Sequence, residues 1–254
     1  MGHTIFPANL KSTVEEIYMY NPEAYDAVSA RSSSSIEVNT FIAKVYAWMT
    51  FALIVTALVA MYIAFNPKLV KLIILTKPMF WGIIIAELGL VFILSAFINR
   101  MSAATATAMF VAYSALNGLT LSIVFLAYTA TSITSTFFIT AGTFGAMSAY
   151  GYFTKRDLTS IGNLCFMALI GLIIAMVVNI FLASTMMNLI ISCVGVLVFV
   201  GLTAYDTQKI KALGATVDEA SEAGRKGAIM GALALYLDFI NLFLMLLNLL
   251  GDRK

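Results

Sequence analysis

Charged residues are scarce in this sequence: Asp, Glu, Lys and Arg make up 11% of its 254 residues, while hydrophobic residues make up 61%. Soluble globular domains contain about 25% charged residues. The composition therefore excludes an ordinary water-soluble domain and indicates an integral membrane protein. The formal net charge is only +2, so nothing points to a nucleic-acid-binding surface. The lipid bilayer is the first partner that we expect.

Histidine and cysteine are also nearly missing. The single histidine, His3, cannot supply the ligand set of a zinc-dependent intramembrane hydrolase. No lysine lies in the apolar stretch 228–249, which excludes a seven-helix retinal protein. The sequence has no Gly-rich phosphate loop and no spaced Ser/His/Asp set. We therefore expect neither an enzyme nor a cofactor, and we expect Cys165 and Cys193 to pack in the core.

Long hydrophobic runs dominate the rest of the chain. A helix needs about 20 apolar residues to cross about 30 Å of hydrocarbon. Seven segments satisfy this length, and they lie near 41–65, 79–98, 104–128, 132–152, 161–182, 187–208 and 228–249. The sequence therefore predicts an all-α integral membrane protein with seven transmembrane helices, and six or eight are the less favoured counts.

The first forty or so residues are polar and lack apolar periodicity. They match neither a cleavable signal peptide nor a myristoylation site. We expect two parts: a mobile cytoplasmic N-terminal tail at 1–40 and a transmembrane domain at 41–251.

The positions of lysine and arginine predict the orientation, because cytoplasmic loops carry an excess of both. With the N-terminus in the cytoplasm, ten of them fall inside: Lys11, Arg31, Lys44, Arg100, Lys155, Arg156, Lys209, Lys211, Arg225 and Lys226. Five fall outside: Lys68, Lys71, Lys77, Arg253 and Lys254. This asymmetry predicts a cytoplasmic N-terminus and an external C-terminus, although the loop 66–78 with three lysines opposes it.

Three acidic residues interrupt or border the apolar segments: Glu87, Asp206 and Asp238. An ionised side chain at the bilayer centre costs about 2.5–3.5 kcal/mol on insertion scales, so such residues normally face the protein interior and find a partner or a proton. For Glu87, a structural hydrogen bond and a pore position remain equally open. Asp206 could be an interfacial residue at a helix end, and Asp238 could be a structural polar tie.

The sixth and seventh segments bring two of these acids to the same side of the membrane. Asp206 lies near the cytoplasmic end of its segment, and Asp238 lies about 15 Å into the next one. Two carboxyl groups within hydrogen-bonding distance cannot both ionise cheaply, so such a pair would share a proton. Arg100 is the nearest cation on that side, and a plain cytoplasmic anchor is its alternative role.

Four stretches of the sequence resemble the Bax inhibitor-1 family, the transmembrane Bax inhibitor motif proteins, and its bacterial inner-membrane branch in particular. They are GLTAYDTQKIK (201–211), GALALYLDFINLFLMLLNLLG (231–251), AYSALNGLTLSIVF (112–125) and TAGTFGAMSAYGYFTKRDL (140–158). The resemblance covers about residues 40–251.

The resemblance implies a fold with the seventh helix at the centre and six helices around it, and a pH-sensitive calcium leak channel. The family's two-aspartate pH sensor then maps onto Asp206 and Asp238, and its lock arginine onto Arg100. In the closed state the aspartates share a proton, Arg100 pairs with one of them, and a change of protonation exposes the carboxylates to calcium, which binds there transiently. The sequence leaves open which direction of pH change opens the path.

Polar residues near this pair are further candidates. Glu87 and Asn241 could contact the ion in a pore, and an interhelical hydrogen bond is the simpler role for both Asn241 and Asn248. Two other functions stay open: a proton/calcium exchanger, and a non-transporting regulator that binds a membrane-bound protease or another membrane protein.

Overall fold

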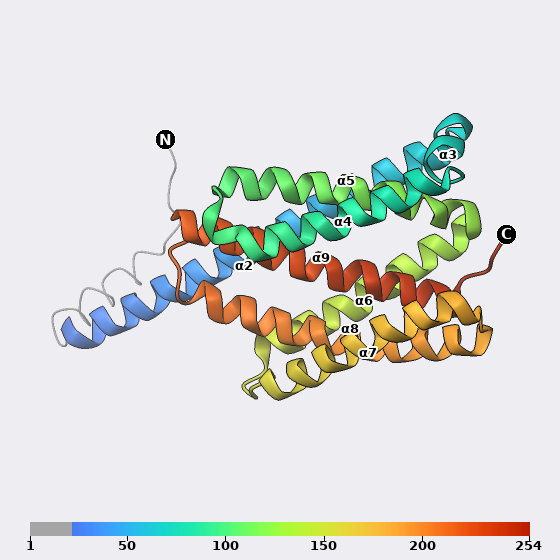
Figure 1. The fold of residues 1–254 in the computed structure, drawn as a ribbon. Coiled ribbons are helices and arrows are strands. Elements are labelled where there is room, and N and C mark those ends of the chain that lie inside the picture. The colour runs from blue at the N-terminus through green and yellow to red at the C-terminus, as the bar shows by residue number, and fades with distance from the viewer. Residues whose placement is uncertain (1–21) are drawn as a thin grey trace.

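The structure of the protein is a computed structural model that describes residues 22–254, with side chains from residue 36 onward. Long helices run alongside one another to form an elongated bundle (Figure 1). The helices are α2 (Pro22–Ala64), α3 (Pro67–Ile73), α4 (Lys77–Phe97), α5 (Ala103–Ala127), α6 (Ala130–Phe153), α7 (Thr159–Leu182), α8 (Thr185–Gly214) and α9 (Glu222–Leu250), and a 3₁₀ turn, η1 (Ile98–Arg100), follows α4. The predicted all-α fold class is confirmed in this described part.

Each of the seven predicted segments overlaps one long helix to within a residue at its end, and two other boundaries differ clearly from expectation. The loop 66–78 contains the short helix α3, which starts at Pro67. The first helix begins at Pro22 instead of near residue 41, because the stretch 23–40 contains neither glycine nor proline. The first 21 residues of the predicted tail lie outside the described residues, so its mobility remains a prediction.

Six helices of the described part are long and apolar enough to cross a membrane: α2, α4, α5, α7, α8 and α9. The remaining long helix, α6, has 24 residues but is rich in threonine and serine. Four of its serine and threonine residues are buried, and Thr140 Oγ1 donates a hydrogen bond to Thr136 O at 2.8 Å. By length and composition, six described helices can therefore cross the membrane. A seventh crossing, by α6, stays a prediction.

The last helix, α9, is the most enclosed of these six. In its most apolar stretch 61% of the residues are buried, against 11% in α4 and 6% in α7. It packs on α2, α5, α6 and α8, and it lies between the α4–α5 side and the α7–α8 side of the bundle (Figure 1). Leu235, Tyr236 and Leu242 of α9 have no exposed surface. Side chains of α9 therefore form much of the core.

A serine or threonine hydroxyl group caps the N-terminus of four of the helices. Ser102, Thr129, Ser184 and Ser221 each accept a hydrogen bond from a backbone N–H in the first turn of α5, α6, α8 and α9, respectively. Such caps satisfy donors that have no partner inside the helix. Ahead of α7, two hydrogen bonds from Thr159 to Asp157 Oδ1 hold the pKa of the Asp157 carboxyl below its usual range.

The two cysteines differ in their surroundings. Cys165 is half-buried on α7, and its Sγ packs where a side chain on Gly201 would otherwise lie. Cys193 is exposed on the surface of α8. The expectation of core packing is therefore wrong for Cys193, because an apolar run alone does not tell which helix face turns outward.

Candidate functional site

Asp238 lies deep inside the bundle, where α9 contacts its neighbours. Its side chain is only 4% exposed. The next residue, Phe239, packs edge-on against Phe137 and Phe144 of α6, with ring centroids 5.6 and 5.4 Å apart. These contacts fix the rotation of α9 and thereby turn the carboxyl group of Asp238 toward α8.

Asp206 of α8 meets Asp238 there. Their carboxyl groups lie close enough to influence each other. Ionised carboxylates only accept hydrogen bonds, so a hydrogen bond between these two groups would require a proton on one of them. Oδ2 of Asp238 is buried and has no hydrogen-bond partner within the described residues. The structure thus brings together the two aspartates that the sequence predicts to meet.

Arg100 lies apart from this pair. It belongs to η1, is exposed, and holds its guanidinium over the ring of Phe97 at 5.8 Å from the centroid. Within the described residues it forms no ion pair with either aspartate. The pairing expected for the closed state is absent from this structure, because α4 packs mainly on α5 and not on α8.

Lys209 is a cation near Asp206. It follows Asp206 by three residues on the same helix, and its charge is close enough to influence that carboxyl group. Its ammonium group lies 6.0 Å from the centre of the Tyr205 ring. The spacing i, i+3 brings two residues to one helix face, so the sequence contained a signal for this neighbour.

Glu87 belongs to a second polar cluster, which joins α4 to the core. Its Oε1 accepts a hydrogen bond of 2.9 Å from Thr120 Oγ1 of α5. One turn away on α5, Asn117 Oδ1 accepts from the hydroxyl of Tyr236 at 3.2 Å, and that hydroxyl contacts Thr56 Oγ1 at 2.7 Å. Glu87 therefore makes the structural hydrogen bond that was one of its two expected roles. Thr56, Asn117 and Tyr236 were not among the residues predicted from the sequence.

The two asparagines of α9 behave differently. Asn248 Nδ2 donates to Ser192 Oγ of α8 at 2.6 Å, and its Oδ1 accepts from Asn188 Nδ2 at 3.2 Å. The predicted interhelical bond is confirmed for Asn248. It is wrong for Asn241, whose Nδ2 donates to Leu237 O of the same helix at 2.8 Å, because a carbonyl one turn back is within its reach.

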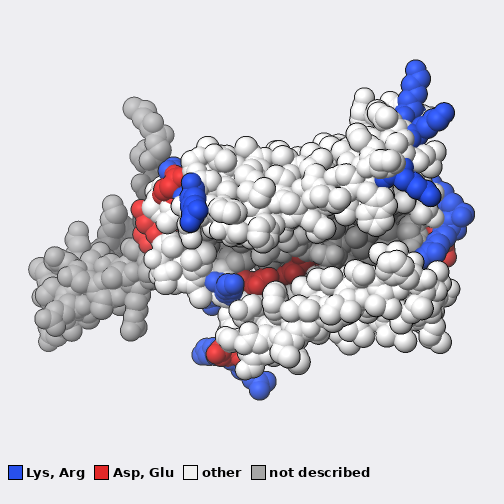
Figure 2. Space-filling model, in the orientation of Figure 1, with Lys and Arg blue, Asp and Glu red and all other residues white. Residues whose placement is uncertain are grey.

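Charged groups gather at the two ends of the molecule, and a strip of acidic atoms lies between them (Figure 2). This strip occupies a hollow between the α4–α5 side and the α7–α8 side. Within the described residues no group of three or more His, Cys, Asp and Glu side chains is placed to hold a metal ion. Any cation at the aspartate pair would therefore need further oxygen ligands from water or the backbone.

The sequence matches the family described as "Inhibitor of apoptosis-promoting Bax1" over residues 38–254. The inner membrane protein YbhL of Escherichia coli K12 is 52% identical over 229 residues, which are 88% of this chain and 98% of that protein. An uncharacterized protein of Borreliella burgdorferi is 46% identical over 85% of this chain and 93% of its own length. One of Deinococcus radiodurans is 45% identical over 85% and 92%.

These matches agree with the resemblance drawn from the four stretches and extend it to residue 254. Together with six apolar helices, they support a multi-pass protein of the bacterial inner membrane. The chain belongs to the Bax inhibitor-1 family.

Proposed function

We propose that the protein is a pH-sensitive leak channel for calcium in the bacterial inner membrane, gated by the carboxyl pair Asp206–Asp238. One observation carries the proposal: the carboxyl groups of Asp206 and Asp238 lie close to each other inside a bundle of apolar helices, and Asp238 is buried. A pair that shares a proton changes its charge when the pH changes. Its oxygens are ligands of the kind that calcium prefers.

The proposal includes the complete arrangement in the membrane. Seven helices cross it, with α6 as the seventh crossing, α9 at the centre, the N-terminus in the cytoplasm and the C-terminus outside. The burial of α9 and its packing on four other helices support the central position. In a state in which α4 has moved toward α8, Arg100 pairs with one of the two aspartates and holds the path closed. Glu87 keeps α4 attached to α5 through Thr120 in either state.

The test is calcium flux into liposomes that hold the purified full-length protein and an entrapped calcium indicator. Asparagine has nearly the shape of aspartic acid but does not titrate. We therefore expect Asp206→Asn and Asp238→Asn to abolish the pH dependence of the flux. The matched control is Asp252→Asn, which changes an acid at the other end of α9. Aspartate-pair variants that leak calcium with the pH dependence of the parent would contradict the proposal.

A proton/calcium exchanger would use the same carboxyl pair, and the same liposomes distinguish it from a leak. An exchanger moves protons against calcium, so a calcium gradient would build a pH difference across the membrane even when an ionophore holds the potential at zero. A leak would build none. We expect no such proton movement.

A non-transporting regulator is the alternative in which the N-terminal residues matter most. Because α2 begins at Pro22, removing residues 2–21 leaves every described helix in place. We expect this deletion to leave calcium flux and its pH dependence unchanged. Flux that is absent from both the parent and the deletion variant would favour the regulator.

A further inference from the structure

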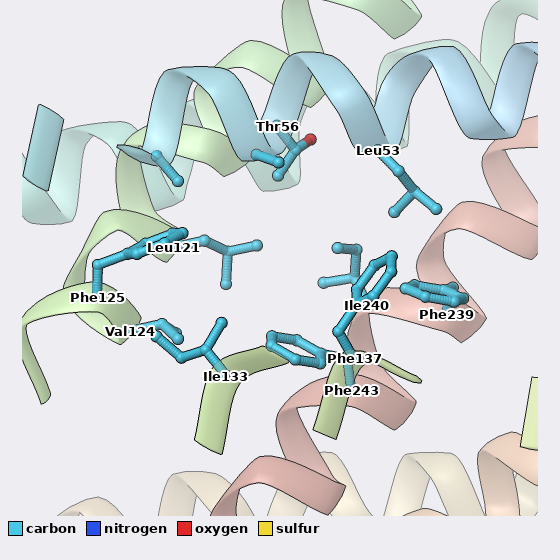
Figure 3. A pocket seen from close by; sticks show the side chains of 12 residues that line it. Leu53, Thr56, Leu121, Val124, Phe125, Ile133, Phe137, Phe239, Ile240 and Phe243 are labelled. Carbon is cyan, nitrogen blue, oxygen red and sulfur yellow. The ribbon is translucent and has the colours of Figure 1, made fainter. Parts of the chain in front are cut away.

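A second feature of the bundle lies beside the aspartate pair and has no part in the proposed gating. It is a cavity of about 110 Å³ between α2, α5, α6 and α9. Figure 3 shows its lining side chains pointing inward from these four helices. Phe239, Ile240 and Phe243 form its α9 wall, and the first two directly follow Asp238.

The lining offers no hydrogen bond to a ligand. Thr56 is the one lining residue with a polar side chain. Its hydroxyl donates to Ser114 O at 2.8 Å and contacts the hydroxyl of Tyr236 at 2.7 Å. A bound water needs two to four polar partners, whereas apolar cavities of comparable size, about 150 Å³, stay dry and take up benzene or xenon. The chemistry of the lining therefore fits a hydrocarbon.

The cavity opens toward the surface that faces the bilayer. Ala57 of α2 and Phe137 of α6 line it and are themselves exposed, Phe137 by 43%. Next to them on the surface lie other exposed apolar side chains, Leu58 and Phe138. Of the four helices, α2, α5 and α9 are among the six apolar enough to cross a membrane.

The depth of the cavity suits a lipid tail. Leu121 lies six residues before the end of α5, and Phe137 lies seven residues after the start of α6. At 1.5 Å per residue this is about 10 Å from the helix ends. The hydrocarbon layer is about 30 Å thick, so the opening meets the acyl chains of one leaflet, the leaflet at the end of the bundle where α5 joins α6.

We propose that this cavity is a binding site for the hydrocarbon tail of a membrane phospholipid, which enters between α2 and α6. Lipid tails are the molecules that surround the opening, and a tail is narrow enough for a space of this size. Between protein and lipid there is no hydrophobic driving force, so the gain comes from dispersion contacts that the empty space lacks. The tail would touch Phe239 and Ile240, and its presence would support the rotation of α9 described above.

The experiment uses the full chain in lipid nanodiscs that contain a phospholipid with a diazirine in the middle of one acyl chain. Light converts the diazirine to a carbene with loss of N₂, and the carbene inserts into a nearby C–H bond. Mass spectrometry then locates the labelled residues. We expect labelling of Ile240 or Phe243 on the inner wall, in addition to Phe138, which faces the bilayer.

Ala57→Phe places a ring at the mouth of the cavity and should abolish the labelling of the inner wall. Ala47→Phe is the matched control, because Ala47 is exposed on the same helix and does not line the cavity. Both variants should retain the labelling of Phe138, which verifies the fold.

Three results would overturn the proposal. The first is an unlabelled inner wall in a parent protein whose Phe138 is labelled. The second is inner-wall labelling that Ala57→Phe does not change. If the inner wall becomes labelled only when the protein is diluted in lipid, a second copy of the chain occupies the cavity instead, and the proposal is likewise wrong.

Discussion

Tyr236 joins three helices through a single hydroxyl group. The ring has no exposed surface and stacks edge-on with Phe110 and Tyr113 of α5. The hydroxyl donates to Asn117 of α5 and contacts Thr56 of α2. It thus satisfies polar atoms that would otherwise be buried without partners, which is costly where water is absent.

Tyr236→Phe should lower the free energy of unfolding by about 1–3 kcal/mol, since it removes one hydroxyl and leaves Asn117 and Thr56 short of a partner. Denaturant unfolding in detergent micelles, followed by circular dichroism, measures the change. Tyr62→Phe is the control, because Tyr62 is 65% exposed, and it should have little effect. Equal effects of the two substitutions would show that the buried network adds no stability.

At the scale of helices, α6 and α8 pack tightly against each other at Gly151. A Cβ atom on Gly151 would lie 2.2 Å from the backbone oxygen of Ala204, a distance that no side chain can occupy. Gly145, six residues earlier on the same helix, would place a Cβ with no atom within 4 Å. One glycine is therefore required for packing, and the other is not.

Gly151→Ala should force α6 away from α8 and lower the free energy of unfolding by about 1–3 kcal/mol. Gly145→Ala should leave it unchanged or raise it by up to about 1 kcal/mol, because alanine favours the helix more than glycine does. The same unfolding assay compares the two variants. Equal stability of both proteins would contradict the close approach of α6 and α8.

Hydropathy was sufficient to predict the long helices, because a run of about 20 apolar residues is a strong signal in itself. It missed α3, whose seven residues are too few for such a signal, and it missed residues 22–40 of α2, which are helical but polar. It also did not reveal that Cys193 faces outward. Burial on one face of a helix depends on neighbours that are distant in the sequence.

At the scale of the whole molecule, the basic residues separate into two groups. Lys44 pairs with Glu219, and Lys211 donates to Tyr152 O, at the end where α8 passes into α9. At the other end, Lys254 donates to Phe125 O, and Arg253 lies over Tyr128. The grouping agrees with the division used for the orientation, and it leaves open which end lies in the cytoplasm.

A reporter fused after Lys254 tests the orientation. We expect alkaline phosphatase to be active there and a green fluorescent protein to stay dark, because this end should lie outside. The same reporters inserted at Thr216, between α8 and α9, should behave in the opposite way. Fluorescence from the fusion after Lys254 would reverse the assignment.

The aspartate pair could be predicted because a carboxylate in an apolar segment is costly and needs a partner. The residues around the pair could not be predicted from the sequence. The position of Arg100 depends on where α4 packs, and the cluster of Thr56, Asn117 and Tyr236 depends on the contact of α2, α5 and α9. Hydroxyl and amide groups cost less to bury than charges, so in the sequence they do not stand out from ordinary core positions.

The late position of α9 in the chain has a consequence for biosynthesis. Translation delivers this helix after α2, α5, α6 and α8, which all pack on it. The residues after it then close the assembly, since Asp252 N donates to Ser132 Oγ and Lys254 N donates to Ala127 O, more than a hundred residues away in the sequence. During synthesis the nascent chain must therefore hold its earlier helices in the bilayer with their inner faces uncovered.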